Sequence, residues 1–201
     1  MLTQFSFRAA ILAAVTATLL IGCGDTTENT QTKSADTEID LAAAEDRWRQ
    51  PLFNGLGGVD FPITTSSAVA QDYFNQGLAL SYAFNHAAAD FAFTEATIYD
   101  PDCAMCYWGS ALVLGPNVNA NMVPDNAPRA FGLARTAKEL SDNVSAKERM
   151  LIDALQQRYL AIEPKDRASL SEAYADGMRE VMKAFPKDAH IATLAAESMM
   201  D

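Results

Sequence analysis

Two cysteines three positions apart, Cys103 and Cys106, are the residues whose types and spacing best suit chemistry in this sequence. A pair at this spacing can form a local disulfide, hold a metal ion or carry out thiol redox reactions. Tyr107 follows the second cysteine where a covalent haem motif requires histidine, which excludes haem attachment. Structural zinc usually draws four ligands, and this pair supplies two. A structural role is therefore favoured, metal binding and redox chemistry are the alternatives, and no cofactor is predicted.

A second candidate site is polar and contains His86, Asn117 and Asn119. His86 lies at the turn before a predicted helix over about 87–99, whereas Cys103 lies beyond that helix. The helix spans about 20 Å, so the histidine and the cysteine pair belong to opposite edges of the fold. Turns of neighbouring helical hairpins stack, so we expect His86 to face the loop that contains the two asparagines. The alternative is structural: the histidine braces its turn, and the asparagines satisfy loop backbone groups.

Apolar residues at helical spacing, separated by helix-stopping residues, predict an all-α fold. The residue before Pro101 is biased away from helical geometry, which ends one helix there, and Pro116 follows the end of the next. Ser145 and Glu148 have the spacing of a capping box and open another helix. The predicted helices cover about 68–84, after Ser67, then 87–99, 104–114, 127–140, 145 onward, 170–185 and 189 onward.

The positions of small residues repeat along the first four of these helices. Gly77 and Ala111, where one helix must approach its neighbour closely, stand 34 residues apart. In the partner helices Ala89 recurs as Ala130, a shift of 41 residues. The second hairpin therefore carries seven extra residues, 41 less 34, and they fall between its two helices.

These features resemble the tetratricopeptide repeat, whose length is about 34 residues, and within that class exported bacterial proteins. The resemblance rests on three runs of sequence, Phe84-Asn85-His86, Asp100-Pro101-x-Cys103-Ala104-Met105-Cys106-Tyr107-Trp108-Gly109 and Leu114-Gly115-Pro116-Asn117. It departs from the template at Gln76 and Leu80, where Leu and Tyr are usual. It implies a right-handed α-solenoid whose concave groove binds a protein segment, and it brings no catalytic residue. Helix positions outside the core would line this groove, namely Asn75, Gln76, Ser81 and Ser110.

The first 22 residues have the composition of an export signal. Arg8 precedes an apolar run over 9–21, which is shorter than the roughly 20 residues that a membrane-spanning helix needs. The run ends in Leu-Ile-Gly-Cys, which resembles the bacterial lipobox and implies cleavage before Cys23 and lipidation of its thiol. An ordinary signal peptide is the alternative. Gly24 stands where retained inner-membrane lipoproteins often carry aspartate, so the resemblance favours an outer-membrane anchor facing the periplasm. This lipid anchor is the expected contact with the membrane.

Three regions follow the signal. Polar composition over 23–45 predicts a flexible tether. Prolines and glycines over 46–66 predict an irregular lead-in that packs as a cap on the first helical hairpin. The helical repeat domain covers 67–201, and its last residues, Met199 and Met200, are apolar with no following helix to cover them. We therefore expect the chain to be the N-terminal part of a longer repeat protein.

The formal net charge is -11, and removing residues 1–22, which hold one Arg and no acid, leaves 14 basic and 26 acidic residues. Nucleic acid is bound through basic patches, so this acidity argues against a nucleic-acid partner. The expected function is a scaffold or adaptor in the cell envelope that binds a protein or peptide segment without catalysis. The alternatives are a metal-handling or thiol-redox protein using Cys103 and Cys106, or an enzyme whose active site lies beyond residue 201.

Overall fold

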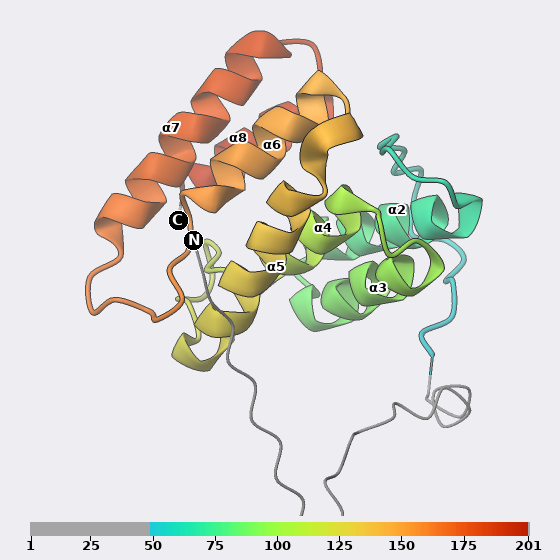
Figure 1. The fold of residues 1–201 in the computed structure, drawn as a ribbon, viewed down its shortest axis with the longest axis horizontal. Helices are drawn as coiled ribbons and strands as arrows, with labels where there is room; N and C mark the ends of the chain where they lie inside the picture. The colour runs from blue at the N-terminus through green and yellow to red at the C-terminus, as the bar shows by residue number, and fades with distance from the viewer. Residues whose placement is uncertain (1–48, 201) are drawn as a thin grey trace, which may run out of the picture. The chain divides into compact units, whose positions relative to one another are not determined.

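The computed structural model describes residues 49–200, and this part of the chain is all-α, as the sequence predicts (Figure 1). Its seven α-helices are α2 (Ala68–Tyr82), α3 (His86–Tyr99), α4 (Ala104–Leu114), α5 (Ala127–Glu139), α6 (Ala146–Gln156), α7 (Ala168–Ala184) and α8 (Ala189–Ser198). Two short 3-10 helices, η1 (Pro124–Asn126) and η2 (Ser141–Asn143), lie in the connections. The predicted helix boundaries agree with these to within two residues.

The predicted signal peptide, tether and lipidation site Cys23 lie outside the described residues. Among the helices of 49–200, none combines the length and the apolar composition that a membrane crossing needs.

Polar side chains at the helix starts explain where several helices begin. The Ser67 hydroxyl accepts a hydrogen bond from the amide of Ala70 at the start of α2. At α6, Ser145 and Glu148 form the predicted capping box, in which each side chain accepts from the backbone N–H of the other. Asp188 accepts from two amides at the start of α8. These bonds satisfy amides that have no partner within their own helix, so single polar residues fix the helix starts.

The helices pack in chain order, with α4 at the centre. Each helix contacts the next, and α4 also contacts α2 and α6. All but two of the eleven residues of α4 are buried, including Trp108 and Gly109. A helix that is apolar all round needs neighbours on every side, and α2, α3, α5 and α6 supply them.

Three helices approach one another closely at the ring of Phe93 on α3. This ring lies against Gly77 on α2 and Gly109 on α4, and a Cβ atom added at either glycine would overlap it. The repeat pattern predicts Gly77 as a close-approach position, and the structure confirms this. Phe93 itself is fully buried and packs on Phe74 with ring centroids 5.4 Å apart. Because Gly77 and Gly109 have no side chains, α2, α3 and α4 can pack this closely.

Residues 49–66, which we call the strap, reach much further than a cap on the first hairpin. Phe61 is buried beside Phe74 of α2 and His190 of α8. The amide of Thr64 donates to the carboxylate of Glu148 on α6, 84 residues away in sequence. The strap therefore joins the first and last described helices, which the sequence does not predict.

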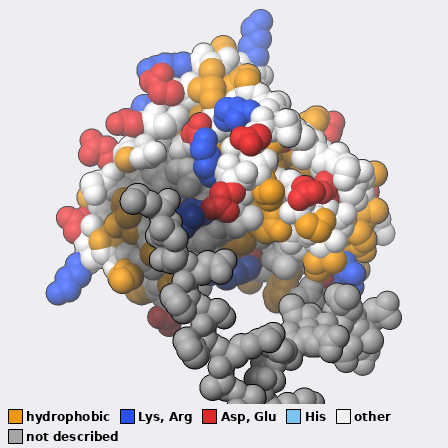
Figure 2. Space-filling view, in the orientation of Figure 1, with side chains coloured by type: hydrophobic (Ala, Val, Ile, Leu, Met, Phe, Trp, Pro, Cys, Tyr) orange, Lys and Arg blue, Asp and Glu red, His pale blue; other side chains and the backbone are white. Residues whose placement is uncertain are grey.

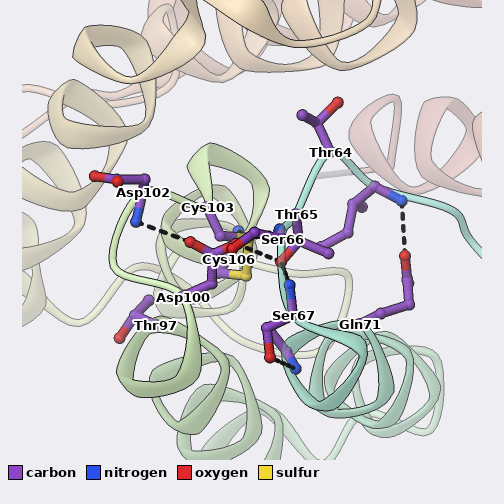
Figure 3. Close-up of a disulfide and its surroundings, with 12 residues drawn as sticks. Thr64, Thr65, Ser66, Ser67, Gln71, Thr97, Asp100, Asp102, Cys103 and Cys106 are labelled. Carbon is purple, nitrogen blue, oxygen red and sulfur yellow. Dashed lines mark hydrogen bonds between the residues drawn. A yellow bond between two sulfur atoms is a disulfide. The ribbon is translucent and has the colours of Figure 1, made fainter.

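The strap ends at the carboxylate of Asp100, in the junction between α3 and α4 (Figure 3). Its oxygen atoms accept from the Thr65 hydroxyl at 2.5 Å, the Ser66 amide at 2.7 Å and the amide of Asp102 at 3.2 Å. Burial alone would raise the pKa of Asp100, but these hydrogen bonds outweigh it and hold the pKa below its usual value. The ionised carboxylate is thus part of the fastening of the strap.

Charged groups on the surface are mixed in sign. On the face seen in Figure 2, basic side chains stand next to acidic ones. Exposed ion pairs such as Arg129–Asp90 and Lys138–Asp153 have N–O distances of 2.6 Å. Pairs of this kind each contribute about 0–1 kcal/mol, so the fold does not depend on them.

We expect Gly109→Ala to lower the free energy of unfolding by about 1–3 kcal/mol, because the added methyl group overlaps the Phe93 ring in a filled core. Gly132→Ala is the matched control. It lies within α5 with no atom near its missing Cβ, and it should gain about 0.5–1 kcal/mol through helix propensity. Urea unfolding followed by circular dichroism measures both. Equal stability of the two variants would contradict the role of Phe93.

The fastening at Asp100 predicts acid sensitivity. Because its pKa is lower in the folded than in the unfolded chain, the carboxylate stabilises the fold above the unfolded value of about 3.9, and this stabilisation disappears as pH falls through the folded value. Asp100→Asn should therefore unfold with a shallower dependence on pH below about 5. The exposed Asp125→Asn should keep the wild-type slope. Urea titrations from pH 7 to 2 test this, and parallel slopes for wild type and Asp100→Asn would refute it.

Candidate functional site

A pocket of about 500 Å³ opens between the end of α2, the turn that follows it and α8. We call it the α2–α8 pocket. Apolar side chains predominate in its lining, with a few polar groups among them. The lining residues are Ser81, Tyr82, Phe84, His86, Leu112, Ala192, Thr193, Leu194, Ala196, Glu197 and Met200.

Phe84 at the pocket has a strained backbone. The turn after α2 is closed by hydrogen bonds from the Phe84 amide to Ser81 and from the Asn85 amide to Leu80, the pattern of a Schellman motif. Glycine is usual at this left-handed position, yet Phe84 has φ 57°, the one positive φ among the described non-glycine residues. Such a conformation costs about 1–3 kcal/mol and concentrates at functional sites. Phe84 is 52% exposed, and its ring is stacked on His86 with centroids 6.2 Å apart.

The structure brings His86 and Asn117 together, as the hairpin geometry predicts. The Asn117 side-chain nitrogen lies 3.4 Å from Nδ1 of His86. Asn119 contributes only its backbone N–H, which donates to Asn117 at 2.8 Å. Across residues 49–200, no three His, Cys, Asp or Glu side chains are grouped in a way that could hold a metal ion. The contacts among these three residues match the structural alternative, in which His86 braces its turn and the asparagines order the loop.

Two buried residues that the sequence analysis missed hold this loop in place. Arg158 is 1% exposed and donates to the carbonyl of Pro116 at 2.8 Å. The Tyr159 hydroxyl donates to the carbonyl of Ala111 at 2.7 Å. Together they leave no room for a side chain at Gly115. A buried arginine carries no sequence signal of its own, because arginine is normally a surface residue.

The Tyr82 and His190 rings connect the pocket to the strap. They are stacked with centroids 5.8 Å apart, and the Tyr82 hydroxyl lies 3.0 Å from Nδ1 of His190. Burial and then the nearby Asp188 carboxylate raise the pKa of Tyr82, which keeps its hydroxyl protonated. Phe61 of the strap meets the edge of the same imidazole. The cleft between α2 and α8 is therefore filled by Phe61 toward one end and open as the α2–α8 pocket toward the other.

Cys103 and Cys106 form a disulfide at the start of α4 (Figure 3). The two residues are 1% and 0% exposed, and the Cys103 sulfur caps the helix by accepting from the Cys106 amide. His86 begins α3 and the disulfide follows its far end, about 20 Å away. A buried disulfide that caps a helix supports the structural role that the sequence favours.

The four groove candidates are placed differently from expectation. The Asn75 side chain accepts from the Phe61 amide, and Gln76 bonds both Phe53 and Pro51, so the strap already uses these amides. Ser110 is buried in α4. Ser81 lines the α2–α8 pocket, whereas Asn75 and Gln76 line a smaller pocket of about 270 Å³ between α2 and the strap. The expectation fails because the repeat pattern does not reveal that the strap crosses α2.

If the disulfide is structural, replacing both cysteines should cost stability without changing the fold. For so short a loop we expect Cys103→Ser with Cys106→Ser to lower the free energy of unfolding by about 2 kcal/mol. In the wild type, the burial of both sulfurs predicts slow reduction. Alkylation after brief dithiothreitol treatment, mapped by peptide mass, should label these cysteines only when urea is present. Rapid labelling of the folded protein would point to redox chemistry instead.

The site is thus an apolar pocket with a strained aromatic residue in its lining, next to a loop ordered from the protein interior. Comparison of the chain with protein-family models, with curated proteins and with solved structures finds no match.

Proposed function

We propose that this protein is a non-catalytic binding module that holds an apolar side chain of a partner protein in the α2–α8 pocket. The observation that carries the proposal is the pocket itself. Its volume of about 500 Å³ falls in the range of ligand sites, and Tyr82, Leu112 and Leu194 give it an apolar wall. Ser81 and Thr193 provide hydroxyl groups that orient a bound segment. The exposed Phe84 ring adds a rigid surface for stacking at little entropic cost.

We also propose a tetratricopeptide-like arrangement for the helices. Three observations support it: each helix packs on the next, α4 also contacts α2 and α6, and the small residue Gly77 lies where α2 closely approaches α3. In such an arrangement alternate helices line the inner face. The α2–α8 pocket then belongs to that inner face.

We place the module at the cell envelope, exported and anchored through Cys23. The apolar run over 9–21 and the Leu-Ile-Gly-Cys sequence support this placement. A polar stretch over 23–45 would give the module reach from the membrane. A scaffold that captures one partner close to a membrane surface is the role that fits these features.

A pocket-filling substitution tests the proposal. Ala196 lines the pocket and is exposed, so Ala196→Trp should fill the pocket and leave the core intact. The matched control is Ala189→Trp, on the same helix and outside the lining. A peptide selected from a displayed random library on the wild-type protein serves as the probe. Fluorescence anisotropy should show an affinity loss of tenfold or more, about 1.4 kcal/mol, for Ala196→Trp only. Unchanged affinity in Ala196→Trp, or failure to select any peptide, would contradict the proposal.

A further inference from the structure

We propose that residues 61–64 of the strap are an internal ligand, and that the cleft between α2, α6 and α8 recognises an extended partner segment with an aromatic residue followed by proline, an aliphatic residue and threonine. This inference concerns the part of the cleft that Phe61 fills, so it does not depend on what the open pocket binds.

The strap is held as a peptide is held, by side chains that bond its backbone. The Phe61 amide donates to Asn75 at 3.1 Å, and the Ile63 amide donates to Gln71 at 2.9 Å. The same Gln71 side chain donates to the Phe61 carbonyl at 2.9 Å, so one amide group grips the segment in both directions. Elsewhere in residues 49–66, the carbonyl groups of Gln50 and Pro51 accept from the side chains of Tyr73 and Gln76. Within this range, the backbone makes none of the main-chain hydrogen bonds that close the other turns of the described chain.

Burial alternates along the segment as it does in an extended ligand. Phe61 is buried, Pro62 is exposed, Ile63 is partly buried and Thr64 is exposed. Successive side chains of an extended chain point to opposite sides. Proline has no N–H to satisfy, so its exposed place between two clamped amides costs no hydrogen bond. The side chains of Phe61 and Ile63 therefore face the cleft and Pro62 faces solvent, while the exposed Thr64 bonds Glu148 through its amide and its hydroxyl.

Two specific contacts identify the sequence that the cleft prefers. The Phe61 ring lies 5.8 Å from Phe74, meets His190 edge-on at 5.5 Å and has the Lys147 ammonium 4.2 Å above its centre. An aromatic ring makes a cation–π contact with Lys147 and an edge-on contact with the His190 imidazole at the same time, and an aliphatic side chain makes neither. Thr64 places its amide at 2.5 Å and its hydroxyl at 2.7 Å from the two oxygens of Glu148. Only serine or threonine offers a hydroxyl in this way.

A covalently attached ligand competes strongly with an external one. Tethering through a short connection gives an effective concentration in the millimolar range. The segment is joined directly to α2 through residues 65–67, and Gly55 and Gly57, both with positive φ near 85°, precede it. A free segment therefore binds only when the strap is weakened or when the partner binds much more tightly.

The test uses the full chain and a fluorescein-labelled peptide with the sequence of residues 57–66. Phe61→Ala weakens the strap and leaves the cleft residues unchanged. Thr64→Ala is the second strap variant, which removes one hydroxyl of an exposed residue and creates no core cavity. Both variants should bind the peptide at least about tenfold more tightly than the wild type by anisotropy.

Two controls show that binding occurs in the cleft. Adding Gln71→Ala and Asn75→Ala to either strap variant should abolish binding, whereas adding Asp72→Ala, an exposed residue between them, should not. A peptide with alanine at position 61 should not bind. Failure of the peptide to bind either folded strap variant, or loss of the helical circular dichroism signal in both, would show that the segment belongs to the obligatory core and would overturn the inference.

Discussion

The contact of the Phe93 ring with Gly77 and Gly109 is the constraint on which the rest of the structure depends. It brings α2 and α4 close to α3 and so allows α4 to be enclosed on every side. A helix as apolar as α4 is stable in water only when enclosed. Its enclosure then fixes both ends: the disulfide junction at its start and the loop after Leu114, against which Arg158 and Tyr159 are buried.

A second requirement arises because the strap has no regular secondary structure. Its buried backbone groups must still be hydrogen-bonded, since each unsatisfied group would cost about 1–3 kcal/mol. Gln71, Asn75 and Glu148 meet this need from helices far apart in sequence. These polar residues of α2 and α6 thus bind an extended segment, and that segment belongs to the same chain. This leaves the α2–α8 pocket as the apolar opening described above.

Helices and caps were predictable from sequence because their signals are local. The spacing of Ser145 and Glu148, and the small residue at Gly77, depend on neighbours within one hairpin. The strap was not predictable, since its prolines and glycines indicate only irregular structure and its partner Glu148 already has a role as a cap. The pairing of His86 with Asn117 followed from hairpin stacking, whereas the left-handed conformation of Phe84 contradicts local preference.

The strap has a consequence for the order in which the chain assembles. Phe61 is synthesised before every described helix, yet its cleft includes His190 on the last of them. The hydrogen bond from the Thr64 amide likewise cannot form until Glu148, 84 residues downstream, has been synthesised. Such long sequence separations raise contact order, and chains of high contact order fold slowly. The strap, which is made before every described helix, is therefore among the last segments to pack. A nascent chain carries this aromatic, β-branched stretch uncovered until α8 has left the ribosome.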